Sequence, residues 1–170
     1  MLTQDTLIEY GVNIFSKMLG VKVTWEYAII DENTPNLLVE TILMAYDNNF
    51  STIIVNPQIR AVLEYLGYAE GLITIVILSN IAHEVRHAWQ YTQEEFKESL
   101  TIGTTFGSSG MNYAAQIHEI DAYAFQEAFL KFILEDPTYN MEIDNSISDV
   151  VITSIHNRAN ELYEYYKEAF

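Results

Sequence analysis

Two histidines lie four residues apart in the H-E-x-x-H segment 83–87. On an α-helix this spacing puts His83 and His87 one turn apart on the same face, so both imidazoles can reach one Zn²⁺ without backbone distortion. Glu84 lies about 100° round the helix from His83, where it would hold a zinc-bound water rather than ligate. Zinc lowers the pKa of such a water to about 7, and a carboxylate can take its proton during attack on a carbonyl. The spacing therefore predicts a hydrolytic zinc centre with Glu84 as general base.

Two surface histidines at the end of a helix are the alternative interpretation of this motif. The placement of the segment argues against it, because the apolar run Leu72–Ala82 leads directly into the charged and imidazole-rich residues. Buried polar groups cost several kcal/mol when they have no partner, and a metal would supply one. The chain has no cysteine, so its metal ligands must be nitrogen or oxygen atoms.

A catalytic zinc usually has three protein ligands and one position left for water. The third ligand is expected from a separate helix, predicted over Asn112–Leu134, which offers His118, Glu119 and Asp121 within one turn. Asp121 is about 200° round the helix from Glu119, so these two acids cannot both ligate. On the residues alone, any of the three could be the third ligand.

The H-E-x-x-H segment and the segment Glu119–Phe125 together resemble the gluzincin type of zinc peptidase. Within that type they are most similar to the ImmA/IrrE-like group, whose second helix carries an E-x-x-A-x-x-F pattern. The resemblance covers roughly Gly71–Leu134 and implies that Glu119 is the third zinc ligand. Ala122 lies on the same helix face, and its small side chain would let the two helices approach closely. The resemblance also implies a bacterial or phage regulatory protease that acts on a protein substrate.

The group that stabilises the oxyanion cannot be matched to the family residue by residue. By chemistry, the candidates are side chains that could donate to a developing alkoxide. His118 is the first choice as a catalytic residue, because it adjoins Glu119, and Tyr113, Tyr123 and His156 are the other candidates. No third histidine lies six residues beyond His87, which argues against a metzincin.

The elements that must position these residues follow from periodicity and from turn residues. The predicted helices are Thr3–Leu19, Asn56–Leu66, Glu70–Gln93, Asn112–Leu134 and Ser146–Lys167, the predicted strands are Val21–Ile30, Leu37–Tyr46 and Phe50–Val55, and Thr101–Gly110 is predicted to be a flexible loop. Leu72–Ala82 is apolar nearly all round, which predicts a helix buried in the middle of its domain. We expect an α+β, zincin-like fold in one domain, residues 1–170. Its small twisted sheet would pack on the buried active-site helix, and a substrate peptide could add to an edge strand.

Composition limits the possible partners and location. Acids outnumber Lys plus Arg by 24 to 8, which gives a net charge of −16 and argues against direct nucleic-acid binding, because the surface repels phosphate groups. The longest apolar run, Leu72–Leu78, is far shorter than the roughly 20 residues of a membrane span. The first residues do not resemble a signal peptide. We therefore expect a cytoplasmic protein with no membrane association, and the sequence leaves its oligomeric state open.

The sequence as a whole predicts a zinc metallopeptidase that hydrolyses peptide bonds in a protein substrate. The rival is a non-catalytic, acidic binding or inhibitor protein on a zincin fold, for instance a nucleic-acid mimic or an inhibitor of a defence enzyme. A zinc hydrolase that acts on another type of bond is a third interpretation. The intact Glu84 counts against the binding protein, because a metal kept only for structure needs no general base.

Overall fold

The computed structural model describes residues 3–29, 43–106, 116–143 and 147–170, with the backbone alone for 102–106. The chain divides into two compact units, Met1–Ala88 and Trp89–Phe170, which are treated separately below. The described residues form six α-helices, one short 3₁₀ helix and three strands, so the α+β class is confirmed. The single domain stays a prediction. Within the described residues, no helix is long and apolar enough to span a membrane.

The first unit contains a three-stranded mixed sheet of β1 (Thr24–Tyr27), β2 (Met44–Asp47) and β3 (Thr52–Val55), in the order β1-β3-β2. β1 runs parallel to β3, and β2 pairs with β3 antiparallel, so β2 and β3 form a hairpin. β1 and β3 are shorter than predicted. Residues 30–42, which include the first part of the predicted second strand, lie outside the described residues. β2 is therefore an edge strand among the described strands.

The first helix, α1 (Gln4–Leu19), begins and ends as predicted. The hydroxyl of Thr3 caps its N-terminus by accepting from the Thr6 amide, and Gly20 ends it in the left-handed conformation with φ 68°. Such a φ favours glycine, which lacks a Cβ. On its exposed side α1 bonds to β1, since the Trp25 indole N–H donates to Glu9 Oε2 over 2.7 Å.

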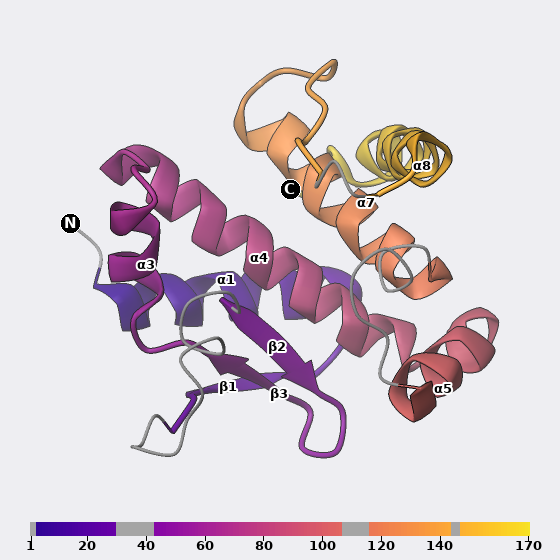
Figure 1. The fold of residues 1–170 in the computed structure, drawn as a ribbon, viewed down its shortest axis with the longest axis horizontal. Helices are drawn as coiled ribbons and strands as arrows, with labels where there is room; N and C mark the ends of the chain where they lie inside the picture. Colours follow the sequence, from indigo (N-terminus) through magenta and orange to yellow (C-terminus); the bar gives the residue numbers. More distant parts are fainter. Residues whose placement is uncertain (1–2, 30–42, 107–115, 144–146) are drawn as a thin grey trace. The chain divides into compact units, whose positions relative to one another are not determined.

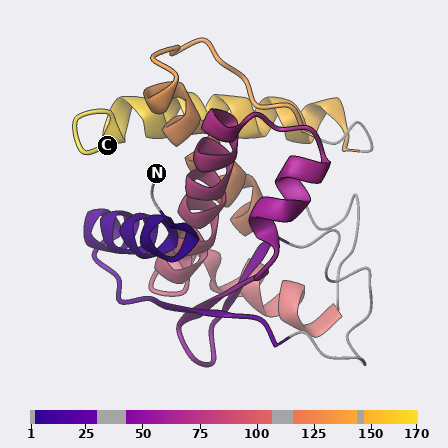
Figure 2. The same ribbon diagram turned by 90° about the vertical axis from the view of Figure 1, so that its left-hand side faces the viewer.

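A long helix, α4 (Glu70–Gln90), carries the H-E-x-x-H segment and runs along both α1 and the sheet (Figures 1 and 2). It ends three residues before the predicted Gln93. The prediction that its apolar first half is buried on every face is wrong: Leu72 is 48% exposed, and the fully buried stripe there is Ile73, Ile77 and Ile81. The helix is instead more completely buried towards its C-terminal end, where its polar residues lie.

The short helix α3 (Ile59–Tyr65) begins later than predicted. Asn56, the first residue of the predicted helix, lies before α3, and its side-chain Oδ1 accepts a hydrogen bond from the Gln58 amide over 2.8 Å. This contact stabilises a turn before the helix. Gly67, with φ 87°, follows the end of α3 and redirects the chain towards α4.

The second unit is helical, with η1 (Glu94–Phe96), α5 (Lys97–Phe106), α7 (Ile117–Ile133) and α8 (Asp149–Tyr166). The predicted loop over Thr101–Gly110 is wrong for 101–106, which are helical, and its remainder lies outside the described residues. α7 packs along α8, as Figure 2 shows. The C-terminal Phe170 ring lies 5.5–5.8 Å from the rings of Phe125, Phe129 and Phe132, so the aromatic C-terminus packs on α7.

Candidate metal centre

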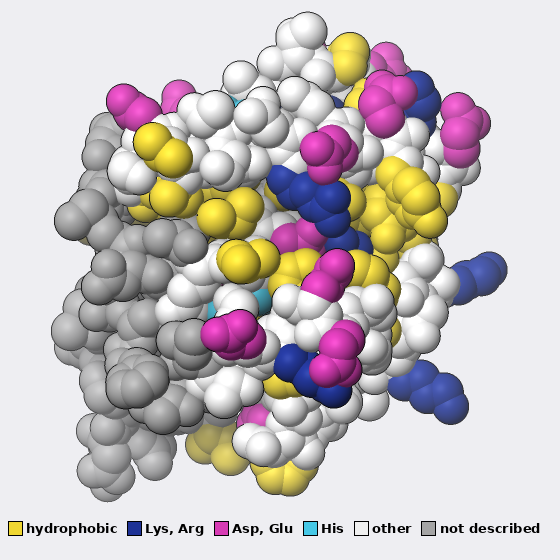
Figure 3. All heavy atoms as spheres, turned by 90° about the vertical axis from the view of Figure 1, so that its right-hand side faces the viewer, with side chains coloured by type: hydrophobic (Ala, Val, Ile, Leu, Met, Phe, Trp, Pro, Cys, Tyr) yellow, Lys and Arg dark blue, Asp and Glu magenta, His cyan; other side chains and the backbone are white. Residues whose placement is uncertain are grey.

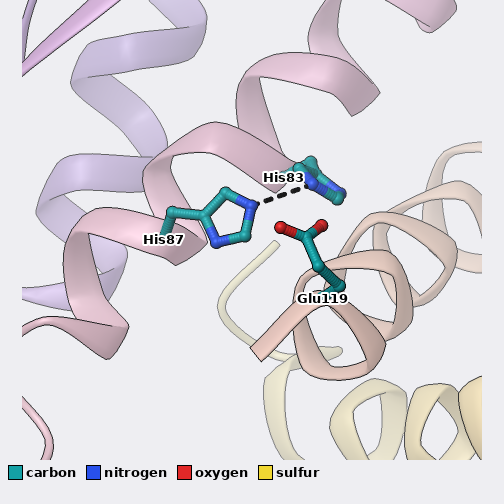
Figure 4. Close-up of side chains that lie close together, drawn as sticks. All are labelled: His83, His87 and Glu119. Atoms are coloured by element: carbon teal, nitrogen blue, oxygen red, sulfur yellow. Dashed lines mark hydrogen bonds between the residues drawn. The ribbon is translucent and has the colours of Figure 1, made fainter. Parts of the chain in front are cut away.

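The two histidines of the motif lie on one face of α4, as their spacing predicts. Their Nε2 atoms are 3.1 Å apart and their ring planes are inclined at 81°, and Figure 4 shows both rings turned towards each other. Both residues are buried. A tetrahedral zinc with bonds of about 2.0–2.1 Å separates two ligand nitrogens by about 3.3–3.4 Å, so the observed spacing is close to that of a shared metal.

Glu84 lies on another face of α4 and reaches the sheet. Its Oε2 accepts a hydrogen bond from the backbone amide of Tyr46 in β2 over 2.8 Å. The Asn56 amide donates to the Leu43 carbonyl, so Leu43 and Asn56 form a hydrogen-bonded pair. In an antiparallel ladder such pairs alternate with pairs that exchange no hydrogen bonds. By this alternation, Tyr46 and Ile53 form a pair without hydrogen bonds to each other. The Tyr46 amide therefore points away from β3, at the outer edge of the sheet. Glu84 remains partly exposed, as a group that handles water must be.

Glu119 is a buried residue in the first turn of α7. His83, His87 and Glu119 each offer one possible ligand atom, and these atoms all lie within 4.8 Å of one another (Figure 4). Two imidazole nitrogens and one carboxylate oxygen form a donor set that suits zinc. The residues present thus fit the metal that the sequence predicts.

His118 precedes Glu119 and is held by neighbours within the second unit. Its Nδ1 lies 2.6 Å from Ser99 Oγ in α5, and its Nε2 lies 3.4 Å from Glu119 Oε1. Both ring nitrogens therefore face groups of the protein, which favours a role in orienting Glu119. The oxyanion role of His118 stays a prediction.

The remaining oxyanion candidates lie in different settings. His156 in α8 has its Nδ1 2.7 Å from Glu127 Oε2 in α7, so its described partner is a buried carboxylate. Tyr123 lies within α7. Tyr113 falls outside the described residues. His156 does not belong to the group of possible metal ligands found among the described residues.

Asp121, the other acid of the α7 turn, has both carboxylate oxygens engaged. Arg158 Nε donates to Oδ1 over 3.1 Å, and Gln90 Nε2 donates to Oδ2 over 3.0 Å. Burial acts to lower the pKa of Arg158, but Glu161 and Asp121 outweigh it and the pKa is raised, so the guanidinium stays charged. These contacts favour Glu119 over Asp121 as the residue available to a metal.

Two buried polar residues of α4 were not identified by the sequence analysis. Arg86 is among the largest fully buried side chains. Gln90 is also buried and donates hydrogen bonds to α7. A buried amide at the end of this helix gives no signal in the sequence, because its acceptors are about 30 residues away.

Comparison of the chain with protein-family models, with curated proteins and with solved structures found no match.

Proposed function

We propose that this protein is a zinc-dependent metallopeptidase that hydrolyses a peptide bond in a protein substrate. His83, His87 and Glu119 would be the metal ligands, and Glu84 the general base. The observation that carries the proposal is the group of three possible ligand atoms within 4.8 Å of one another, with Glu84 next to a ligand in the sequence. The same assignment makes the chain a gluzincin-type enzyme with a zincin-like fold, as its two motifs predict.

The residues divide the chemistry between them. When bound, zinc would supply Lewis-acid chemistry, which acidifies water and polarises a carbonyl group. Glu84 would accept the proton from the attacking water and pass it to the leaving amine. The Tyr46 amide bonds to one of the two Glu84 carboxylate oxygens, which supports a fixed orientation for this base. His118 would orient the Glu119 carboxylate through the 3.4 Å contact between its Nε2 and Glu119 Oε1.

A peptide is the substrate class that the sheet favours. β2 is the edge strand among the described strands, and the Tyr46 amide on its outer edge reaches the Glu84 carboxylate. An extended peptide can add to such an edge by backbone hydrogen bonds. A peptide bound along the outer edge of β2 would run past Glu84. This arrangement supports hydrolysis of a peptide bond rather than of an ester or of another kind of amide.

The binding-protein rival depends on an acidic surface, because it explains the net charge as mimicry of a nucleic acid. On the face in Figure 3, acidic side chains lie singly or in small groups among apolar, polar and basic ones. Among the described residues, Glu161 pairs with Arg158 and Glu164 pairs with Lys167. The part of this face that the structure describes therefore shows no continuous acidic surface, which supports the peptidase over the binding protein.

The test measures metal content and hydrolysis in the same preparations. The wild-type protein should hold about one zinc per chain, and His83→Ala should lose it because one of three ligands is removed. Glu84→Gln should keep the zinc and the fold but lose hydrolysis of a fluorescently labelled, unfolded protein substrate by about 10²–10⁴-fold, since the amide cannot accept a proton.

Glu94→Gln is the matched control, because Glu94 is an exposed acid of the second unit that pairs with Lys97. It should leave both metal content and hydrolysis unchanged. Full zinc retention in His83→Ala would refute the metal site. Equal hydrolysis by Glu84→Gln and the wild-type protein would refute the proposed chemistry and favour the binding protein.

A further inference from the structure

A single buried side chain holds the α7 turn that carries Glu119. Gln90 is 0% exposed, and its Nε2 donates to the backbone carbonyl of His118 over 2.7 Å and to Asp121 Oδ2 over 3.0 Å. The two acceptors are three residues apart on α7, and Glu119 lies between them in the sequence. One amide group therefore contacts the turn on both sides of the proposed ligand.

This turn lacks the side-chain cap that usually fixes the start of a helix. Gln116, at the N-cap position of α7, makes no capping hydrogen bond. Ser99 from α5 contacts the turn, since its Oγ lies 2.6 Å from His118 Nδ1 and 3.4 Å from the His118 amide. The position of the first turn of α7 thus depends on side chains of other helices.

The two hydrogen bonds of Gln90 restrict different movements of the turn. The bond to the His118 carbonyl limits sliding of α7 along its axis. The bond to the Asp121 side chain limits rotation about that axis, because Asp121 projects about 200° away from Glu119. A carboxylate ligand must be held in place to within about 0.5 Å for metal binding, so both restrictions act on Glu119.

Gln90 also belongs to the helix that carries the histidine ligands. It follows His87 by three residues and is the last residue of α4. Gln90 is therefore on the same helix as His83 and His87. Loss of the amide would leave these two ligands on their helix while it releases the turn of the third.

We propose that Gln90 is a positioning residue of the metal centre, which acts by holding the His118–Asp121 turn so that Glu119 can ligate. The inference rests on the proposed metal site. A purely structural role is the alternative, because any buried amide needs hydrogen-bond partners. The two roles differ in one respect: a positioning residue acts on the metal through Glu119, whereas a structural residue acts on the fold alone.

The experiment measures Zn²⁺ affinity by competition with a chromophoric chelator. Gln90→Met keeps a long, unbranched side chain but removes the donor, and it should weaken zinc binding by about 10–100-fold. Asn80→Leu is the matched control, because the Asn80 amide on the same helix donates to Val76 O of α4 itself. Asn80→Leu should leave zinc affinity within about twofold of the wild-type value, because the hydrogen bond that it removes does not contact the turn that carries Glu119.

A cycle with Glu119→Ala separates positioning from general destabilisation. If Gln90 acts through Glu119, adding Gln90→Met to Glu119→Ala should cause no further loss of zinc affinity. An equal loss in both backgrounds, or no loss in the wild-type background, would overturn the positioning role while the metal site stands. A wild-type protein that does not bind Zn²⁺ would overturn the proposed function and this inference together.

The stability of the metal-free protein completes the test. Thermal unfolding in excess chelator should show Gln90→Met folded, so that its lost affinity reflects the site. If Gln90→Met does not fold, Gln90→Ala is used in the same cycle. Failure of Gln90→Ala to fold as well would show that Gln90 is required for the fold itself, and would overturn the specific role.

Discussion

The second unit contains a buried ion pair whose removal gives a prediction about stability. Lys131 and Glu127 lie one turn apart on α7, with side chains 1% and 0% exposed and Nζ 3.3 Å from Oε1. Glu127 Oε2 also accepts from the Met141 amide over 3.0 Å. Lys131 donates to the carbonyls of Pro137 and Tyr139. The pair thereby joins α7 to the segment 137–141.

Lys131→Met removes the cation and leaves the Glu127 carboxylate in the interior. Removing one partner of a buried pair costs about 3–5 kcal/mol. His156 and the Met141 amide still contact Glu127, so we expect the lower part of this range, about 3 kcal/mol. In Glu127→Gln the same lysine substitution should cost clearly less, because no carboxylate is then left unpaired.

Urea unfolding, followed by circular dichroism, measures both free energies of unfolding. Lys97→Met is the control: Lys97 pairs with Glu94 at the surface, with side chains 64% and 84% exposed. An exposed pair contributes about 0–1 kcal/mol. The reasoning is refuted if Lys131→Met costs no more than Lys97→Met, or if its cost is the same in the Glu127→Gln background.

Two further predictions concern the third ligand and the packing of α4. Glu119→Ala should weaken zinc binding strongly, because it removes one of three ligands and leaves the two histidines. Asp121→Asn should stay within the 10–100-fold loss of affinity that is typical of an outer-shell change. A larger loss of zinc affinity in Asp121→Asn, measured by chelator competition, would contradict the ligand assignment. Gly11→Ala in α1 would place a Cβ 2.9 Å from Ile81 Cδ1, so overpacking of about 1–3 kcal/mol opposes a gain in helix propensity of about 1 kcal/mol. Because Ile81→Val deletes that Cδ1, Gly11→Ala should be less destabilising by about 1 kcal/mol in the Ile81→Val background. Urea unfolding measures the change in free energy of unfolding that Gly11→Ala causes in each background. Equal changes in the two backgrounds would show that the contact is unimportant.

Features that depend on neighbours in the sequence could be predicted from it. The spacing of His83 and His87 determined that they share a face of α4, because the helical period is a local property. The predicted helix Thr3–Leu19 agrees with α1 (Gln4–Leu19), in which the Thr3 hydroxyl caps the N-terminus and Gly20 ends the helix. In each case the interactions that decide the structure span only a few residues.

Local patterns failed at two places in the chain. Residues Thr101–Phe106 are helical despite a glycine and several β-branched residues, because differences in helix propensity of less than about 1 kcal/mol per residue are too small to exclude a helix. The apolar stretch that begins at Leu72 is partly exposed, and the buried residues of α4 include the charged Arg86. Apolarity alone did not indicate which part of the helix the rest of the protein would cover.

The contacts of the acids in the α7 turn were decided by tertiary structure. On the residues alone, Glu119 and Asp121 were equivalent carboxylates separated only by their helix faces, and only the family resemblance favoured Glu119 as a ligand. Arg158, 37 residues after Asp121, and Gln90, 31 residues before it, engage the Asp121 carboxylate. No local pattern encodes such pairings, because they arise only when helices far apart in the chain pack together and each buried polar group must find a partner.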